Sequence, residues 1–379
     1  MIDELMNTEC IQVGNFRLKN GNVSKYYFDM RNLIAYPKLL AKIGDALYEM
    51  MGEFDIICGI PYGALPIATY ISVTYNKPLI YIRDKVKEYG MKNRIEGKFS
   101  KTDRCVLLDD VITSGGSMQE AYDLLEDQVD VVKCLVIMDR QQSKICTCEV
   151  ESLLNKTDVV KYRLHQVRTK KKTKLCFSAD LTDLPKLWSI LDQIGEHLVI
   201  CKIHYDIIPE HQKEEFKTKL LEYSLKFDFL IMEDRKFNDI SQIVQKQYIA
   251  FENWVDMITV HVLVNPQVLQ KLSGAIIVAN MSNNTYDFSI QATEMAFANE
   301  NHVIGFVSQT RIDNHFVNMT PGISLYSKNE DDQKYRTIDK VDTDIIIVGR
   351  AIYNSQNVKQ DVLSLIGGNQ GSPITPSFS

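Results

Sequence analysis

Short apolar runs alternate with stretches of helical spacing in the first part of the chain. One helical stretch has apolar residues three and four positions apart, at Leu39, Leu40, Ile43, Leu47 and Met50. Four apolar runs follow it: DIICGI, PLIYI, CVLLDD and VVKCLVIMD. Continuous apolar runs are typical of strands that are covered on both faces. Their alternation with helices predicts an α/β domain built on a parallel sheet with crossover helices.

Eight strand-like runs follow between residues 175 and 350: LCFSAD, LVICKIH, FLIMED, MITVH, AIIVAN, VIGFVS, VNMTPGI and DIIIVGR. Segments of helical spacing separate most of them, at 184–194, 214–225 and 289–298. Eight strand and helix units predict a TIM (β/α)8 barrel, in which the C-terminal strand ends meet at one face. Nearly every run ends in polar residues, which we expect to converge there: Asp180, Lys202 with His204, Asp234, His261, Ser282, Ser308 with Gln309, and Arg350.

The apolar pattern weakens between these two parts, and the intervening segment ends in RTKKKTK. A charge run without apolar periodicity is most simply a solvated linker. We therefore expect a first domain over 1–145, a connecting segment and linker over 146–174, and the barrel over 175–367. The polar tail over 368–379 is rich in Gly, Ser and Pro and is expected to be disordered.

The composition is that of an ordinary globular protein with room for two domains. The 379 residues are 45% hydrophobic and 24% charged, which is enough to form two cores. The net charge of -6 argues against nucleic-acid binding, which usually needs a basic face. No apolar stretch approaches the roughly 20 residues that span a bilayer, and no signal pattern is present, so we expect no membrane association.

The eight cysteines mostly stand alone inside apolar runs, as is typical of small core residues. A reducing, cytoplasmic compartment is therefore expected. Cys146 and Cys148 form a CxC pair, but no second pair lies at ligand spacing, and a zinc site is accordingly disfavoured.

A candidate phosphate site lies in the run VLLDDVITSGGS, residues 106–117. The acid pair Asp109 and Asp110 ends a predicted strand, where the two carboxylates could accept hydrogen bonds from ribose hydroxyls. A loop of small residues then leads into a predicted helix, and its backbone N–H groups could approach a phosphate closely. The loop consists of Thr113, Ser114, Gly115, Gly116 and Ser117. A simple capped turn remains the alternative interpretation.

This run, together with three further segments, resembles the type I phosphoribosyltransferases and, among them, orotate phosphoribosyltransferase. The segments are FRLKNGNVSKYYFDMR at 16–31, CGIPYGALPIA at 58–68 and IMDRQ at 137–141. The resemblance implies transfer of phosphoribosyl from phosphoribosyl pyrophosphate to orotate, with Mg²⁺ carried by the pyrophosphate and no protein metal ligand. It also implies a homodimer, because a mobile loop of one subunit reaches into the site of its partner.

The resemblance also assigns residues to both substrates of the transfer. Orotate, a flat anion, would be held by an aromatic wall and cationic groups, from Lys19, Tyr27, Phe28 and Arg140. Phosphoribosyl pyrophosphate would contact the acid pair, the small-residue loop and two further loops that contain Tyr62, Gly63, Arg83, Lys87, Tyr89 and Lys92. For Tyr27 and Phe28, core packing is an alternative. Asp84 stands where the family usually has a pyrophosphate-binding lysine, and Lys85 is its neighbour.

Alternating charges mark the second and third barrel runs. Lys202, Asp234, Lys236 and Asp239 carry them. A single such pair would more often be a surface ion pair. With SAD at the first strand and KIH at the second, the segment DRKFND resembles the pattern of the orotidine monophosphate decarboxylase family, over residues 175–353.

The resemblance implies decarboxylation without a cofactor, in which fixed charges must stabilise a ring carbanion. Asp234 would lie beside the departing carboxylate, and Lys236 would stabilise the carbanion and donate the proton. Lys202 would hold the array, and Asp239 would reach the ribose bound by the partner subunit. Substrate-binding residues are implied at Asp180 for the ribose, at Ser282 for the pyrimidine, and at Gln333, Tyr335 and Arg350 for the phosphate, and Ser178 is a further substrate-binding residue.

The second part departs from the decarboxylase family in three places. Ser241 and Ile243 replace a glycine and a threonine that commonly follow Asp239. The stretch after Ser282 is shorter than in typical relatives. A helix that usually precedes the first barrel strand is expected to be absent, with RTKKKTK in its place.

The order of the two parts resembles that of the uridine monophosphate synthase family. The first part would make orotidine monophosphate, and the second would convert it to uridine monophosphate and carbon dioxide. Two alternatives remain open. In one, either half is a binding or dimerising scaffold, and the transferase is the candidate because of Asp84 and Gln141. In the other, decarboxylation is lost and transfer retained.

Overall fold

The computed structural model describes residues 1–18, 21–83, 94–142, 146–281, 286–325, 328–330 and 333–367. Contacts divide the chain into two units, the first with Met1–Phe16 and Tyr26–Val159 and the second with Arg17–Lys25 and Val160–Ser379. The predicted disordered tail lies outside the described residues. So do several residues singled out in the sequence: Lys19, Asp84, Lys85, Lys87, Tyr89, Lys92 and Ser282. Of Gln333 only the backbone is described.

The first unit is built on a mainly parallel sheet, as predicted. Within the described residues it has six strands in the order β5-β4-β3-β6-β7-β8, of which β5 alone is antiparallel. The strands are β3 Ile56–Gly59, β4 Leu79–Ile82, β5 Ile95–Glu96, β6 Arg104–Ile112, β7 Asp130–Asp139 and β8 Val150–Asn155. Continuous apolar stretches in β3, β6 and β7 are buried because helices cover the sheet.

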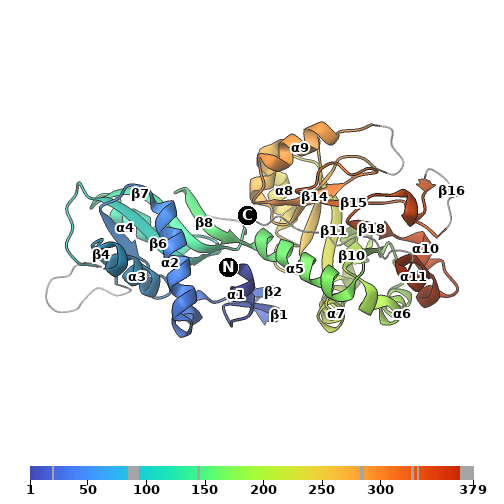
Figure 1. Ribbon diagram of the computed structural model, residues 1–379, viewed down its shortest axis with the longest axis horizontal. Helices are drawn as coiled ribbons and strands as arrows, with labels where there is room; N and C mark the ends of the chain where they lie inside the picture. Colours follow the sequence, from blue (N-terminus) through green and yellow to red (C-terminus); the bar gives the residue numbers. More distant parts are fainter. Residues whose placement is uncertain are drawn as a thin grey trace. The chain divides into compact units, whose positions relative to one another are not determined.

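Three helices of this unit lie between its strands along the chain (Figure 1). They are α2 Pro37–Met51, α3 Leu65–Tyr75 and α4 Gly116–Leu125. Helix α2 buries the apolar face with the spacing of three and four that the sequence contains. Before α2 come α1 Ile2–Met6, β1 Ile11–Arg17, β2 Val23–Phe28 and a 3-10 turn at Met30–Ala35. Strands β1 and β2 form a separate pair.

The expectation of a linker over 146–174 was wrong. Strand β8 pairs with β7 in the sheet, and helix α5 Lys156–Lys171 directly precedes the first barrel strand. Asn155 and Asp158 cap this helix reciprocally, each side chain accepting from the other's backbone N–H at 3.1 and 3.0 Å. The helix that was expected to be absent is therefore present. Its sequence shows no clear apolar periodicity, because charged residues stand between the buried apolar ones. The buried apolar residues are Val159, Val160, Leu164 and Val167.

The second unit contains the predicted barrel. Among its described residues, eight parallel strands close into a ring in the order β9-β10-β11-β12-β13-β14-β15-β18. Each coincides with one of the eight runs in the sequence: β9 Leu175–Ser178, β10 Ile200–Ile203, β11 Leu230–Phe237, β12 Met257–His261, β13 Ala275–Val278, β14 Val303–Val307, β15 Val317–Thr320 and β18 Ile345–Val348. The predicted (β/α)8 fold is therefore confirmed.

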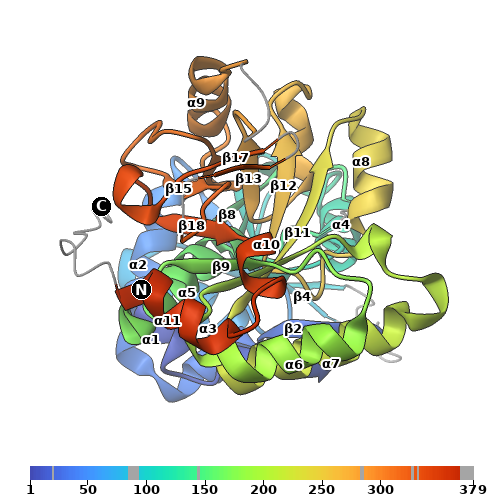
Figure 2. The same ribbon diagram turned by 90° about the vertical axis from the view of Figure 1, so that its right-hand side faces the viewer.

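Helices lie around the outside of this ring (Figure 2). They are α6 Leu184–Ile194, α7 Lys213–Phe227, α8 Ser241–Tyr248, α9 Ser289–Phe297 and α11 Val358–Gly367. The short helix α10 Arg350–Tyr353 instead follows β18 directly and contributes to the cavity of the barrel. A short hairpin, β16 Lys328–Glu330 with β17 Gln333–Tyr335, precedes β18. Among the described residues, no helix is both long and apolar enough to cross a membrane.

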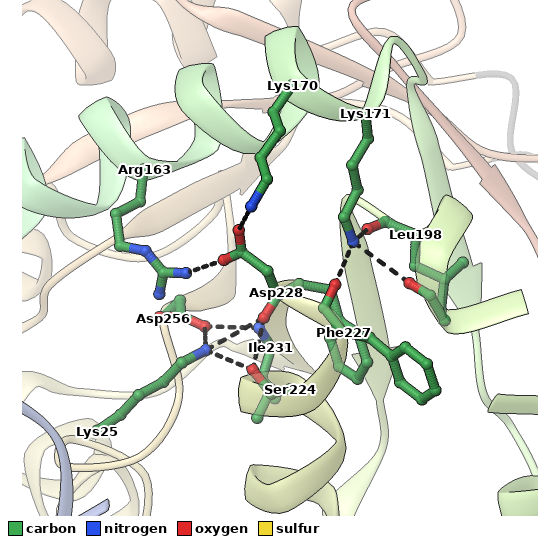
Figure 3. A network of polar contacts seen from close by, with 12 residues as sticks. Lys25, Arg163, Lys170, Lys171, Leu198, Ser224, Phe227, Asp228, Ile231 and Asp256 are labelled. Atoms are coloured by element: carbon green, nitrogen blue, oxygen red, sulfur yellow. Dashed lines mark hydrogen bonds and ion pairs between the residues drawn. The ribbon is translucent and has the colours of Figure 1, made fainter. Parts of the chain in front are cut away.

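A segment from the N-terminal part of the sequence belongs to the barrel unit. Lys25, fully buried, donates to Asp256 Oδ2 at 2.5 Å and to Ser224 Oγ at 2.8 Å (Figure 3). Asp256 directly precedes β12 and also accepts from Ile231 N of β11 at 2.6 Å. The Lys25 N–H donates to Asn253 O at 3.0 Å. These contacts join the segment Arg17–Lys25 to the N-terminal ends of two barrel strands.

Candidate active sites

The charge array of the barrel is assembled from two neighbouring strands. Lys202 on β10 and Lys236 on β11 contact the same carboxylate oxygen, Asp234 Oδ2, at 2.7 and 2.9 Å. Asp180, after β9, lies 3.5 Å from Lys202 Nζ. These four side chains come together as the sequence predicted, because the parallel strands bring their C-terminal ends to one face.

The backbone around Lys236 departs from regular strand geometry. The pairing of β11 with β12 shifts register between Glu233 and Phe237. Lys236 has a φ of 52°, in the left-handed region. Its N–H donates to Thr259 Oγ1 of β12 at 2.8 Å, and this hydroxyl in turn donates to Asp234 Oδ1 at 2.8 Å. Thr259 Oγ1 therefore contacts both the Asp234 carboxylate and the Lys236 backbone.

The array is held in its charged form. Burial favours the neutral form of Asp234, but the attraction of Lys202 and Lys236 outweighs it and lowers the pKa of the carboxyl. Burial likewise opposes the charge of Lys202, yet Asp234 and Asp180 raise its pKa above the usual value. A cation beside a carboxylate stabilises the charged form of both groups. Asp234 and Lys202 therefore keep their charges at neutral pH.

His204 and Thr259 also belong to the site. His204 was expected to converge there with the other strand-end residues but was given no role, whereas Thr259 was not predicted. His204 Nε2 lies 3.1 Å from Lys202 Nζ and 3.4 Å from Asp234 Oδ2. Burial, followed by repulsion from Lys202, lowers the pKa of the imidazole, which favours the neutral ring. The motif KIH was the available signal for His204, whereas Thr259 lies inside an apolar run without any signal.

A cavity of about 540 Å³ opens beside the array. Predicted residues line it: Ser178, Asp180, Lys202, Asp234, Lys236, Tyr335 and Arg350. Other lining residues include Met281, Gly322, Gly349 and Tyr353. Ser178 Oγ donates to Asp180 at 2.9 Å, and the Arg350 guanidinium lies 5.7 Å from the centre of the Tyr335 ring. The cavity thus has carboxylates and lysines together with an arginine at the start of α10.

Asp239 does not line this cavity. Its exposed side chain accepts from Ile240 N at 2.7 Å, at the start of α8. The neighbouring Ile240 and Ile243 are also exposed. Within one chain, Asp239 is therefore outside the group of charges formed by the other predicted residues.

The acid pair of the first unit, Asp109 and Asp110, lies within β6, in a confined position. Asp109 is buried, and its Oδ1 accepts from Asp110 N at 2.8 Å. Burial, reinforced by the neighbouring Asp110, raises the pKa of Asp109 to about 8. A Cβ on Gly63 would lie only 1.9 Å from Asp110 Oδ2, so the loop backbone approaches this carboxylate as closely as glycine allows.

The small-residue loop leads into α4 as predicted. Gly115 precedes the helix with a φ of 82°, a conformation that favours glycine. Thr113, Ser114, Gly116 and Ser117 surround this turn and the first helical residues. The N–H groups of a first helical turn lack intrahelical acceptors and can bind an anion. The geometry fits the predicted phosphate site.

Two further loops flank this region in the sequence. Tyr62, next to Gly63, is 72% exposed. Arg83, at the end of β4, forms an ion pair of 2.8 Å with Glu96 on β5. Arg83 is the last described residue before 84–93, the segment with the other predicted loop contacts.

The predicted orotate residues have mixed environments. Phe28 is buried, and the Arg140 guanidinium lies 5.8 Å from its ring centre. Tyr27 is half-buried and stacks on Phe16 at 5.4 Å. Gln141 has a structural contact, because its side-chain oxygen accepts from Thr157 N at 2.9 Å at the start of α5. This departure from the family therefore caps a helix.

All eight cysteines are free thiols, and most of them are buried core residues as expected. Cys146 and Cys148 are the half-buried exceptions. Among the described residues, no group of three or more His, Cys, Asp or Glu side chains is arranged to hold a metal ion.

Comparisons with known proteins match the two parts of the chain to two families. The orotidine 5'-phosphate decarboxylase / HUMPS family matches residues 173–365, and the phosphoribosyl transferase domain matches residues 29–146. The chain is 28% identical to uridine 5'-monophosphate synthase of Bos taurus, over 94% of this chain and 93% of that protein.

Separate enzymes match the individual halves. An orotate phosphoribosyltransferase of Pyrococcus horikoshii is 40% identical, over 38% of this chain and 79% of its own. An orotidine 5'-phosphate decarboxylase of Pichia kudriavzevii is 33% identical, over 52% of this chain and 86% of its own. The chain therefore belongs to the bifunctional uridine 5'-monophosphate synthase family, with orotate phosphoribosyltransferase and orotidine 5'-phosphate decarboxylase activities that form uridine monophosphate in pyrimidine biosynthesis.

Proposed function

We propose that decarboxylation takes place at the array of Lys202, Asp234 and Lys236. The observation that carries this proposal is the single buried carboxylate oxygen of Asp234 shared by two lysines, at 2.7 and 2.9 Å. Asp234 lies beside the carboxylate of bound orotidine monophosphate, where its negative charge opposes the ground state. As the carboxylate departs as carbon dioxide, negative charge develops on ring carbon 6, and the nearby Lys236 ammonium stabilises it. Lys236 then donates the proton that replaces the carboxylate.

The rest of the cavity positions the nucleotide. Ser178 and Asp180 bind the ribose at the end of β9, and Arg350 binds the phosphate together with Tyr335. A guanidinium matches two phosphate oxygens at once, which fixes the orientation of the substrate. Ser282 and Gln333 complete the predicted contacts to the pyrimidine and the phosphate. Binding energy at the phosphate holds carbon 6 of the ring at the array.

The test is Lys236→Ala, assayed for both reactions in one preparation. Conversion of orotidine monophosphate to uridine monophosphate is expected to disappear, and pyrophosphate release from orotate and phosphoribosyl pyrophosphate is expected to continue. Lys246→Ala, at an exposed lysine on α8, is the matched control and should leave both reactions unchanged. Retained decarboxylation in Lys236→Ala would contradict the assignment.

For the transferase half, we propose that Asp109 and Asp110 hold the ribose hydroxyls and that the loop 113–117 holds the 5'-phosphate. The support is the close approach of Gly63 to Asp110 and the free first turn of α4. Tyr62, Arg83 and the loop 84–93, with Lys87, Tyr89 and Lys92, contact the pyrophosphate. Lys19, Tyr27, Phe28 and Arg140 hold orotate. Absence of pyrophosphate release by the folded protein would favour a non-catalytic scaffold instead.

We propose that the pyrophosphate would carry Mg²⁺ in this half, without a protein metal ligand. The predicted groups around the pyrophosphate include no cysteine or histidine, which fits a hard cation. When bound, the ion neutralises charge on the leaving pyrophosphate. The eight free thiols favour a reducing, cytoplasmic location for both activities.

We also propose a homodimer in which Asp239 serves the partner's decarboxylase site. Asp239 is exposed beside Ile240, whose side chain is 66% exposed, and apolar exposure of this kind marks interfaces. Mixing inactive Lys236→Ala and Asp239→Ala proteins, with subunit exchange, should restore activity. Half of the dimers are then mixed and have one intact site of two, so roughly a quarter of the wild-type activity is expected. No restoration would refute the shared site.

A further inference from the structure

The hydroxyl of Thr259 links the two charged groups that the proposed decarboxylation depends on. It donates to Asp234 Oδ1 at 2.8 Å, whereas the two lysines contact Oδ2. The hydroxyl oxygen of Thr259 also accepts from Lys236 N at 2.8 Å. Thr259 is fully buried in β12, between Ile258, which pairs with Glu233, and Val260, which pairs with Phe237. One side chain therefore contacts the array from the neighbouring strand.

The direction of both hydrogen bonds is determined by chemistry. The carboxylate of Asp234 is charged because its pKa is lowered, so it can only accept. The Lys236 N–H can only donate. The single hydroxyl proton of Thr259 must then point at Asp234, and a lone pair must receive the Lys236 N–H. Serine could make both bonds, whereas valine could make neither.

The contact to Lys236 compensates an irregular backbone. A left-handed conformation is unfavourable for a residue with a Cβ. Lys236 has this conformation, with φ 52°, where the pairing of β11 with β12 shifts register. Its N–H bonds to the hydroxyl of Thr259 rather than to the β12 backbone. The branched side chain of threonine has few rotamers in a strand, so the oxygen is held at a fixed place.

We propose that Thr259 is a positioning residue for decarboxylation, which fixes the Asp234 carboxylate and the Lys236 backbone relative to each other. This inference rests on the proposed roles of Asp234 and Lys236. A carboxylate held by lysines on one oxygen can still rotate about its Cβ–Cγ bond. The hydroxyl on Oδ1 restricts that rotation, and because it also accepts from the Lys236 N–H, it links the carboxylate to the backbone of the proton donor. Catalysis depends on such placement, because small displacements of reacting groups have large effects on rate.

The test compares Thr259→Val, Thr259→Ser and Thr218→Val. Valine keeps the shape of threonine without the hydroxyl, and kcat for decarboxylation should fall about 10- to 100-fold, the usual effect of losing an orienting contact. The KM for orotidine monophosphate should change much less, because the phosphate and ribose contacts remain. Serine should recover most of the lost kcat. Thr218→Val, at an exposed hydroxyl on α7, should leave kcat unchanged.

The transferase reaction of the same chains controls for the amount of active protein, and the fluorescence of the barrel tryptophans Trp188 and Trp254 controls for folding of the barrel. Transfer should keep its wild-type rate in every variant, since Thr259 lies in the barrel unit. A wild-type kcat in Thr259→Val, or equal loss in the serine and valine variants, would overturn the positioning role. If Thr259→Val does not fold, Thr259→Cys replaces it, because cysteine keeps the size of the side chain but is a weaker hydrogen-bond donor. A wild-type kcat in Thr259→Cys would likewise overturn the positioning role. Lys236→Ala is assayed in parallel. If it remains active the proposed function fails, whereas an inactive Lys236→Ala with an active Thr259→Val refutes only the inference about Thr259.

Discussion

The buried ion pair between Lys25 and Asp256 makes the stability of the barrel depend on a residue far away in the sequence. Both side chains are fully buried, and their charged atoms are 2.5 Å apart (Figure 3). Lys25→Met keeps most of the side-chain volume and removes the ammonium. The change should lower the free energy of unfolding of the barrel, although no catalytic residue is touched.

The magnitude follows from the bonds that are lost. Lys25 Nζ donates to Asp256 Oδ2, to Ser224 Oγ at 2.8 Å and to Phe229 O at 3.3 Å. A charge-assisted bond contributes about 1.5–3 kcal/mol and a neutral bond about 1 kcal/mol. Burial works against the ammonium and lowers the pKa of Lys25 to about 8, which offsets part of this gain. Removing one partner of a buried pair costs about 3–5 kcal/mol in general, and we expect a loss near the lower end, about 3 kcal/mol.

The assay is equilibrium unfolding in urea followed by tryptophan fluorescence. The chain has two tryptophans, Trp188 and Trp254, and both are buried in the barrel unit. The signal therefore reports the barrel alone. Lys213→Met is the matched control, since Lys213 contacts Glu210 at 2.6 Å in an exposed pair and should cost less than about 1 kcal/mol. If Lys25→Met changes the unfolding free energy no more than this control, the segment Arg17–Lys25 does not stabilise the barrel and the reasoning fails.

Two further predictions concern the transferase loop and a buried carboxyl. Gly63→Ala would bring a Cβ within 1.9 Å of Asp110 Oδ2, so phosphoribosyl transfer measured by pyrophosphate release should fall at least about tenfold. Decarboxylation by Gly63→Ala should be unaffected. The control is Gly367→Ala, where a Cβ meets open space and both reactions should be unchanged. Normal transfer by Gly63→Ala would contradict the prediction and show that the loop can shift. Glu233 has a pKa raised to about 8 by burial, so the folded state binds more protons than the unfolded state from 4.5 to about 8. The free energy of barrel unfolding should therefore fall as pH rises through this window and should fall less in Glu233→Gln, and identical pH slopes in the two proteins would contradict the shift.

The strands could be predicted because their signal is local. Most barrel strands are continuous apolar runs that end in a polar residue, so both their positions and their functional ends are visible in the sequence. Asp234 and Lys236 could be found for the same reason, since both follow one such run. Parallel pairing then brings Lys202 to them without further information.

The features that were missed depend on contacts between distant segments. Helix α5 could not be recognised because its buried valines stand among charged residues, and its lysines were attributed to solvent. Lys171 in fact donates to the backbone oxygens of Leu198 and Phe227 in the barrel, at 2.6 and 2.5 Å. Thr259 is a polar residue in an apolar strand, and its role depends on the conformation of Lys236. No local pattern contains that information.

The position of Lys25 in the chain has a consequence for synthesis. Its partner Asp256 is 231 residues further along. At translation rates of about 5–20 residues per second, Asp256 is made on the order of 10–50 s after Lys25. During that time the first sheet can form on the ribosome. The segment Arg17–Lys25 cannot yet make its contacts, and Lys25 stays solvated until the barrel has been synthesised. A decarboxylase expressed on its own from α5 onward would never receive this segment, and its nascent barrel would have to bury Asp256 without the lysine.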